Sequence, residues 1–307
     1  MFRVIEVNEL TKRYGDTTAV RQLTFQVRPG HVTGFLGPNG AGKTTTLRML
    51  LGLIAPTGGT ATVDGRPFRD RPRGLRHVGA LLDAGDVHGG RSARAHLSAL
   101  ARSNRIPYSR VDEVLAEVGL SGAAARRRVG GFSLGMRQRL GIATALLGDP
   151  PVLMFDEPLN GLDPEGVLWV RGLFRRLAAE GRTVFVSSHL MSEMENTADQ
   201  LIVIGRGELI AAESVTEFAA RGTRLTVTVR TPDADRLTAV LSAEGAAVAP
   251  YDDRTLKVTA LSAARIGELA FHHRILLEEL TPQAASLEAA FMELTADSAE
   301  FLAGDSR

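Results

Sequence analysis

The sequence predicts an α/β fold built on a phosphate-binding loop, with an antiparallel β subdomain, a helical subdomain and a small C-terminal α+β domain. Three observations predict it. A glycine-rich loop lies between an apolar run and a helical pattern within residues 32–51. An apolar run at residues 152–155 and a buried strand predicted at 183–188 are each followed by polar residues, as strands of a ligand-binding sheet are. The pattern then becomes a shorter alternation of strands and helices, which divides the chain into residues 1–221 and 222–307.

Composition limits the function. The 307 residues carry 36 basic and 35 acidic side chains, a net charge of +1, so no overall field attracts nucleic acid and we expect no nucleic-acid partner. The absence of cysteine excludes disulfides, thiolate nucleophiles and cysteine-bound metals. No run reaches about 18 apolar residues, and the first residues lack the apolar core of a signal peptide. We therefore expect any membrane role to come through a partner.

The first part of the chain predicts an antiparallel hairpin. Short alternating apolar runs occupy residues 2–10 and 18–27, and residues 14–16 supply the turn between them. Tyr14 in that turn is a candidate to stack on a purine base, and packing as a half-buried tyrosine is the alternative. The residues themselves leave both interpretations open.

The central motif matches the phosphate-loop pattern G-x-x-x-x-G-K-[ST] at every position. Its residues are Gly37, Pro38, Asn39, Gly40, Ala41, Gly42, Lys43 and Thr44. The glycines let backbone N–H groups surround a phosphate, because a Cβ would block the approach or forbid a positive φ. The Lys43 ammonium suits the β and γ phosphates, and the Thr44 hydroxyl suits Mg²⁺. Only three of the basic residues are lysines, which makes a lysine here informative.

A helical region follows the loop. After expected strands at residues 60–64 and 77–82, apolar residues recur at helical spacing over residues 91–127, and we place a helical subdomain at about residues 84–135. Ser133 then precedes an apolar helix predicted over residues 140–147. Its hydroxyl suits a helix N-cap and equally an anion site at a helix N-terminus.

Two carboxylates follow the next apolar run. Asp156 and Glu157 come directly after residues 152–155, at the strand end where α/β sheets bind ligands. A phosphate-loop protein needs one carboxylate near Mg²⁺ and one group that orients water, and we assign these roles to Asp156 and Glu157 respectively. The alternative, two acids that favour the dipole of the next helix, leaves the apolar run unexplained.

The remainder of the first domain repeats this arrangement. A turn at residues 160–164 opens a helix around residues 165–179, and the strand predicted at 183–188 ends at His189. Because His189 follows a strand as the two acids do, it is a candidate site residue, whereas the other histidines are taken as structural. A hairpin over residues 201–212 closes the domain.

The C-terminal part predicts a βαββαβ order of ferredoxin-like type, without a catalytic constellation. Three of its four strands are placed, at residues 225–229, 256–258 and 275–277. The expected helices are 233–244 and 263–272, and a last helix is expected at 284–294.

Taken in order, the loop, residues 133–139, the two acids, residues 160–163 and His189 make the sequence resemble the ATP-binding subunits of ABC transporters. The resemblance covers roughly residues 2–221. Within this family the sequence most resembles the drug and antibiotic exporter ATPases of the daunorubicin and bacitracin resistance kind. Residues 132–143 and 286–291 carry that closer resemblance.

The resemblance implies roles for individual residues. Tyr14 would stack on adenine, residues 37–45, including Thr45, would form Walker A, and Asp156 and Glu157 would close Walker B, with Glu157 polarising the attacking water. His189 would be the switch histidine near the γ-phosphate.

It also implies an assembly. Ser133 and Gly135 would belong to the signature motif that faces the ATP of a second copy, and Asp163 would lie in the loop that links the two sites. The active unit would then be a nucleotide-sandwich dimer with ATP and Mg²⁺, bound to a multi-span membrane permease at the cytoplasmic face of the membrane.

The sequence departs from the family pattern at three positions. Leu134 stands where the signature has its first glycine, and Met136 stands where it has glutamine. Asp83 stands where a glutamine commonly senses Mg²⁺ and relays to the permease, and its carboxylate is a candidate Mg²⁺ ligand. Since Glu157 and His189 are present, we expect hydrolysis.

Three functions remain to be weighed. The first is an ATPase that powers export of a small molecule, such as a drug or antibiotic, through a separate permease contacted by residues of about 84–130. The second is a soluble ABC-type ATPase acting on nucleic acid or the ribosome, for which the chain lacks a second cassette and sustained heptads. The third is a module that senses nucleotide without turnover.

Overall fold

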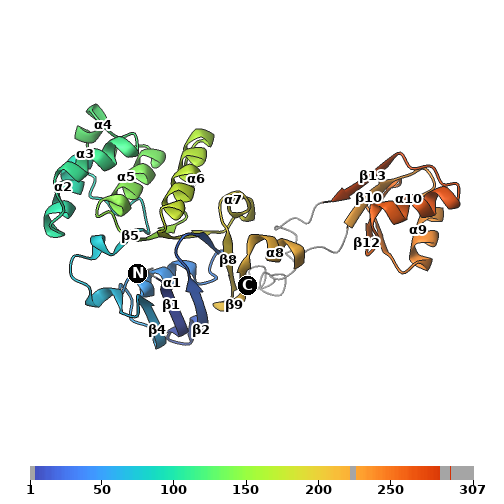
Figure 1. The fold of residues 1–307 in the computed structure, drawn as a ribbon, viewed down its shortest axis with the longest axis horizontal. Coiled ribbons are helices and arrows are strands. Elements are labelled where there is room, and N and C mark those ends of the chain that lie inside the picture. Colours follow the sequence, from blue (N-terminus) through green and yellow to red (C-terminus); the bar gives the residue numbers. More distant parts are fainter. Residues whose placement is uncertain (1–3, 222–225, 284–290, 292–307) are drawn as a thin grey trace. The chain divides into compact units, whose positions relative to one another are not determined.

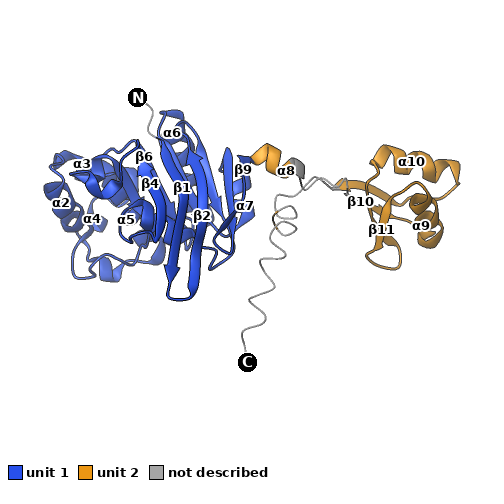
Figure 2. Cartoon of the chain, turned by 90° about the horizontal axis from the view of Figure 1, so that it is seen from below, with its two compact units in different colours: residues 1–214, 301–307 blue, residues 215–300 orange. Residues whose placement is uncertain are grey.

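The computed structural model describes residues 4–221, 226–283 and 291, and these fall into two compact units (Figures 1 and 2). The first unit ends at Ser214 and the second begins at Val215. The helix α8 (Val215–Arg221) occupies the interval between that division and the expected boundary after residue 221. Apart from residue 291, the helix expected at 284–294 lies outside the described residues, as does the 286–291 segment of the resemblance.

A six-stranded sheet forms the centre of the first unit. Its strands are β3 (Val32–Leu36), β5 (Val78–Leu81), β6 (Val152–Asp156), β7 (Thr183–Ser188), β8 (Gln200–Gly205) and β9 (Glu208–Ser214), in the order β5-β6-β7-β3-β8-β9. Neighbours pair in parallel except β8 and β9, which form the predicted hairpin. Every residue of β3, β6 and β7 is buried, which explains why Val, Leu, Met and Phe dominate these strands.

The register of this sheet brings three strand ends together. Leu36 at the end of β3 pairs with Ser188 at the end of β7, and Asp156 at the end of β6 pairs with Ser187. The next residues, Gly37, Glu157 and His189, therefore all leave the sheet at one edge.

A three-stranded antiparallel sheet packs against the central one. It contains β1 (Ile5–Tyr14), β2 (Thr17–Val27) and β4 (Gly58–Val63), in the order β2-β1-β4. Tyr14, which the sequence places in the turn, is instead the last residue of β1. The rings of Phe25, Phe35 and Phe185 join the two sheets, with centroids 5.1 to 6.0 Å apart.

Helices gather beside the sheet (Figure 1). They are α1 (Lys43–Leu50), α2 (Ala93–Ser103), α3 (Ser109–Glu117), α4 (Ala123–Arg126), α5 (Leu134–Leu146), α6 (Pro164–Ala179) and α7 (Met191–Glu195), with 3-10 turns at Phe68–Asp70, Gly74–Arg76 and Val129–Gly131. The stretch expected to be helical at 91–127 is three helices, because Arg105 and Gly119 adopt positive φ where helices end. Helix α5 begins six residues before the expected start, directly after Ser133. No described helix is long and apolar enough to span a membrane.

The second unit has the predicted βαββαβ order. Its elements are β10 (Thr226–Arg230), α9 (Ala234–Ala243), β11 (Ala247–Pro250), β12 (Thr255–Thr259), α10 (Ala263–His272) and β13 (Glu279–Gln283). The strands form an antiparallel sheet in the order β11-β12-β10-β13, which is the ferredoxin-like topology. The strand expected at 275–277 was wrong: the fourth strand begins at Glu279, and Ile275 is buried in the apolar core before it.

Candidate functional site

The phosphate loop crosses from β3 to α1 in a conformation that requires its glycines. Gly40 and Gly42 have φ of 80° and 101°, in the region that favours glycine. A Cβ on Gly42 would lie 2.6 Å from the carbonyl oxygen of Ala19, and one on Gly37 would lie 2.5 Å from that of Ile204. The loop therefore packs closely against the backbone of β2 and β8.

Lys43 lies inside this loop and is 6% exposed. Its ammonium donates hydrogen bonds to the carbonyl oxygens of Gly37 (2.7 Å) and Pro38 (3.3 Å) and lies 3.7 Å from Glu157 Oε1. Burial lowers the pKa of Lys43, and the negative charges of Glu157 and Asp156 oppose that shift. The site thus holds a buried cation where the loop would receive an anion.

Asp156 forms a second group of polar contacts beside the lysine. The Thr44 hydroxyl, in the first turn of α1, donates to Asp156 Oδ2 at 2.6 Å, and the Ser187 hydroxyl donates to Asp156 Oδ1. Oxygen ligands of this kind are those that Mg²⁺ prefers. Two carboxylates, Asp156 and Glu157, stand against the single ammonium of Lys43, so the residues present fit a divalent cation in chemistry and in charge.

Glu157 lies between two of the predicted site residues. His189 Nδ1 is 2.9 Å from Glu157 Oε2, and Lys43 approaches the other carboxylate oxygen. Since an ionised carboxylate only accepts hydrogen bonds, the imidazole must carry a proton on Nδ1. Glu157 adopts a φ of 49°, which is uncommon for a residue other than glycine, and its N–H donates to Ser187 Oγ at 3.0 Å. The structure brings Lys43, Glu157 and His189 into one cluster.

A cavity of about 300 Å³ opens beside this cluster. It is lined by residues 82–85, by Leu134, Arg137 and Gln138 of α5, and by Asp156, Glu157 and Asn160. Asp83 is among the lining residues, so the structure brings it near the two acids. Its Oδ1 accepts a hydrogen bond from the Gly85 N–H at 2.6 Å.

The predicted base-stacking residue is available at the surface. Tyr14 is 49% exposed, and the Lys12 ammonium lies 4.9 Å from the centroid of its ring. Lys12 pairs with Val20 on β2, and Val20 Cγ2 would be 3.1 Å from a Cβ on Gly42. The strand that carries Tyr14 thus pairs with β2, and β2 adjoins the phosphate loop.

Two other predicted residues cap helices. Ser133 Oγ accepts a hydrogen bond from the Met136 N–H at 3.3 Å, and Asp163 Oδ1 accepts one from the Gly166 N–H at 3.0 Å. For Ser133, the capping interpretation is thus confirmed; an anion-binding role stays a prediction. Gly135 lies close to residues 161 and 162, because a Cβ there would be 3.3 Å from the Gly161 carbonyl oxygen.

Sequence reasoning missed two residues of this site. Ser187 bonds both Asp156 and the N–H of Glu157, and the Gln138 amide bonds the carbonyl oxygen of Glu157. A serine inside a buried strand and a glutamine on the buried side of a helix were the available signals. Their partners are distant in sequence, so spacing alone could not identify them.

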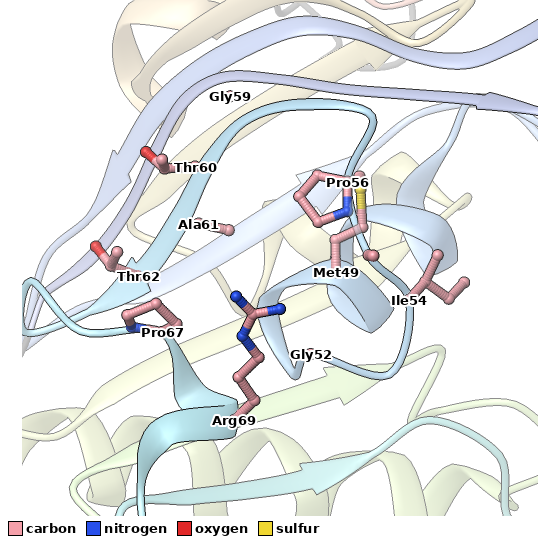
Figure 3. A pocket seen from close by; sticks show the side chains of 11 residues that line it. Met49, Gly52, Ile54, Pro56, Gly59, Thr60, Ala61, Thr62, Pro67 and Arg69 are labelled. Carbon is pink, nitrogen blue, oxygen red and sulfur yellow. The ribbon is translucent and has the colours of Figure 1, made fainter.

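A second pocket of about 170 Å³ lies elsewhere in the first unit, between α1 and the edge strand β4 (Figure 3). Its walls include Met49, Ile54 and Pro56, and Arg69 extends into it from the 3-10 turn. The pocket has a mainly apolar lining and none of the acids of the cluster around Lys43.

Comparison with known proteins gives the context of this geometry. The model of the family described as ABC transporter matches residues 20–160, and a domain of unknown function (DUF8746) matches residues 225–288. The chain is 44% identical over 213 residues to the bacitracin transport ATP-binding protein of Bacillus licheniformis, covering 68% of this chain and 69% of that protein.

Two further matches extend the comparison. An uncharacterized ABC transporter ATP-binding protein of Bacillus subtilis is 33% identical over 304 residues, covering 96% of this chain and 97% of the relative. Among solved structures, the ATP-binding subunit of an ABC transporter aligns with a TM-score of 0.65 at 25% identity, covering 71% of this chain and 92% of that one.

Proposed function

The chain belongs to the family of ABC transporter ATP-binding proteins, and we propose that it hydrolyses ATP to power export of a small molecule through a separate membrane permease. The observation that carries this proposal is the cluster at the sheet edge, where the Glu157 carboxylate lies 3.7 Å from the Lys43 ammonium and 2.9 Å from His189. A buried cation for the phosphates and a carboxylate for water are thus adjacent.

In this proposal each side chain of the cluster has one task. Lys43 turns from the loop carbonyls to the β and γ phosphates, which take the place of those acceptors. Glu157 orients the attacking water and accepts its proton, and His189 holds the carboxylate through Nδ1. Thr44 and Asp156 would hold Mg²⁺, with Asp83 as a further candidate ligand. The metal supplies neutralisation of the charge on the phosphate oxygens.

The other predicted residues serve binding and assembly. Tyr14 would stack on adenine, Thr45 would add its hydroxyl to the first turn of α1, and Ser133 and Gly135 would contact the ATP of a second copy, with Asp163 beside them. ATP then favours the closed dimer, because γ-phosphate contacts to both copies exist only there. Exposure of Ser133 and of Leu134, which is 56% exposed, supports a role for this helix end in contact with another molecule.

The support for an export role comes from the names of similar proteins. The bacitracin transport protein named above and a lantibiotic transport ATP-binding protein of Streptococcus pyogenes, 36% identical over 207 residues, both carry transport in their names. We propose that residues 1–221 are the ATP-binding domain and residues 222–307 an accessory domain. The permease, a multi-span protein, would be contacted through residues of about 84–130 and would hold the chain at the cytoplasmic face of the membrane.

The proposal is tested in two steps. Purified protein, alone or reconstituted with its permease, should release phosphate from ATP only when Mg²⁺ is present. Detergent extracts of native membranes should then yield the chain together with a multi-span protein. Failure to bind or consume MgATP contradicts the enzymatic role, and an ATPase rate stimulated by nucleic acid, without a membrane partner, contradicts the export role.

A further inference from the structure

The side-chain amide of Gln138, in helix α5, binds the backbone carbonyl of Glu157. Gln138, in the second turn of α5, is 5% exposed, and its Nε2 donates to the carbonyl oxygens of Glu157 (3.1 Å) and Asn160 (3.3 Å). Both partners are acceptors, so the amide nitrogen, not the oxygen, must face them. Its two N–H groups therefore bridge the two ends of the turn that follows β6.

The residue it bonds has a backbone that needs support. Glu157 is a non-glycine residue with φ of 49°, a conformation that persists when its surroundings fix it from several sides. Ser187 Oγ accepts from its N–H, and the Asn160 N–H donates to its carbonyl oxygen at 3.3 Å. Gln138 supplies the remaining contact to that carbonyl, and it comes from outside the sheet and the turn.

Helix α5 also packs on this turn through its first residue. Gly161 has φ of 74°, and a Cβ there would lie 2.2 Å from Cδ2 of Leu134. The side chain of Leu134 therefore packs on Gly161, while Gln138 forms hydrogen bonds with the backbone of residues 157 and 160. The first two turns of α5 and the turn after β6 are held together by an apolar contact and by a pair of hydrogen bonds.

Among the described residues, the oxygen of the Gln138 amide makes no hydrogen bond that could account for its burial. Gln138 Oε1 is buried, and within the described part of the chain it has no hydrogen-bond partner. A buried acceptor without a partner is unfavourable. The hydrogen bonds that account for the burial of Gln138 are therefore those from its two N–H groups to the carbonyl oxygens of Glu157 and Asn160.

We propose that Gln138 is a positioning residue for ATP hydrolysis, which fixes the backbone of Glu157 so that its carboxylate stays between Lys43 and His189. The inference rests on the proposed function, because it gives Glu157 the role of orienting water. It links the placement of α5 to the geometry of that carboxylate.

Two replacements test this role. Gln138→Leu removes the donors, and Gln138→Glu keeps the length but turns acceptors toward the carbonyls. We expect each to lower kcat about 10- to 100-fold, as small misplacements of reacting groups do. The KM for ATP should stay within about threefold, because the phosphate loop is untouched. Thr144→Val is the matched control: its hydroxyl donates to Leu140 O within α5, so kcat should stay at the wild-type value.

A double-mutant comparison separates positioning from a general structural effect. In a Glu157→Gln background, Gln138→Leu should leave the residual single-turnover rate unchanged within about twofold, because its effect passes through the missing carboxylate. A further drop in that rate, or a loss of ATP affinity equal to the loss of kcat, overturns the positioning role. So does wild-type kcat in both Gln138 variants when the wild-type protein hydrolyses MgATP. A wild-type protein without turnover instead overturns the proposed function and this role together.

Discussion

The two units of the chain bury different kinds of side chain. The first encloses Lys43 and Asp156, both less than 10% exposed, and holds Glu157 at positive φ. In the described part of the second unit, the buried polar side chain is Thr231, whose hydroxyl donates to Leu276 O at 2.7 Å and accepts from the Asp233 N–H at 3.1 Å. Its core is a cluster of apolar side chains. The Thr228 hydroxyl is also buried, and it has no hydrogen-bond partner within the described residues.

This difference separates stability from function. Burying a charge costs stability, and buried charges persist where a site uses them. The first unit buries charged side chains at one sheet edge, whereas the described part of the second unit has no buried charged side chain and has an apolar core. We therefore expect substitutions at this sheet edge of the first unit to change ATP binding and turnover, and substitutions in the second unit to change stability alone.

Two lysines give the largest contrast. Lys43→Ala removes the buried cation of the loop and should weaken ATP binding about 100-fold or more, since charge-assisted hydrogen bonds to phosphate are lost. Lys257→Ala, at an exposed position of β12 beside Tyr251, should leave the affinity unchanged. Calorimetric titration with MgATP measures both, and equal affinities for the two variants would contradict the placement of the site.

Two glycines with positive φ give the next contrast. Gly42→Ala brings a Cβ to 2.6 Å from Ala19 O, whereas Gly245→Ala, at φ 85°, meets nothing within 4 Å. Both should lose about 1 to 2 kcal/mol of unfolding free energy from backbone strain. Gly42→Ala should in addition lose turnover, because the loop must shift. Denaturant unfolding and phosphate release distinguish the two, and an active Gly42→Ala would refute the packing of the loop.

A cavity in the second unit tests its independence. Leu241 in α9 is fully buried, and Leu241→Ala should destabilise that unit by about 2 to 5 kcal/mol. ATP turnover should stay within about twofold of wild type, because the first unit has a core of its own. Unfolding curves followed beside the ATPase rate check this, and a large loss of kcat would give the second unit a part in catalysis.

The smallest effect concerns a histidine of the helical subdomain. Burial, with a smaller contribution from the positive charge of Arg91, lowers the pKa of His96 below 6.5. In the pH interval just below 6.5 the unfolded chain therefore binds the proton more readily, and stability falls as the pH decreases through it. His96→Gln should show a shallower fall in unfolding free energy than wild type, which denaturant unfolding at a series of pH values measures. A His96→Gln slope equal to wild type would contradict the burial effect.

The sequence predicted the elements whose signals are local. A continuous apolar run located β6, and a shorter run of Val184, Phe185 and Val186 located β7. The loop motif predicted the glycine-dependent conformation that Gly42 adopts. Acids and a histidine directly after strands predicted the cluster of Glu157 and His189, because neighbouring parallel strands end at one edge.

The remainder depends on contacts between distant residues. Gln138 and Ser187 act through partners 19 and 31 positions away, which no spacing rule relates to them. The expected start of α5 was late because the capping contact of Ser133 outweighs weak periodicity in the first turn. The fourth strand of the second unit was misplaced because Ile275 packs into the apolar core ahead of the strand and is not part of the sheet.

The central claim is that water attacks bound ATP under the control of Glu157. The most direct measurement compares wild type with Glu157→Gln for MgATP binding, dimerisation by light scattering and phosphate release. The account predicts that the variant binds MgATP, remains dimeric with it, and releases phosphate about 10²- to 10⁴-fold more slowly, the loss typical of a missing general base. Phosphate release by the variant at the wild-type rate would contradict it.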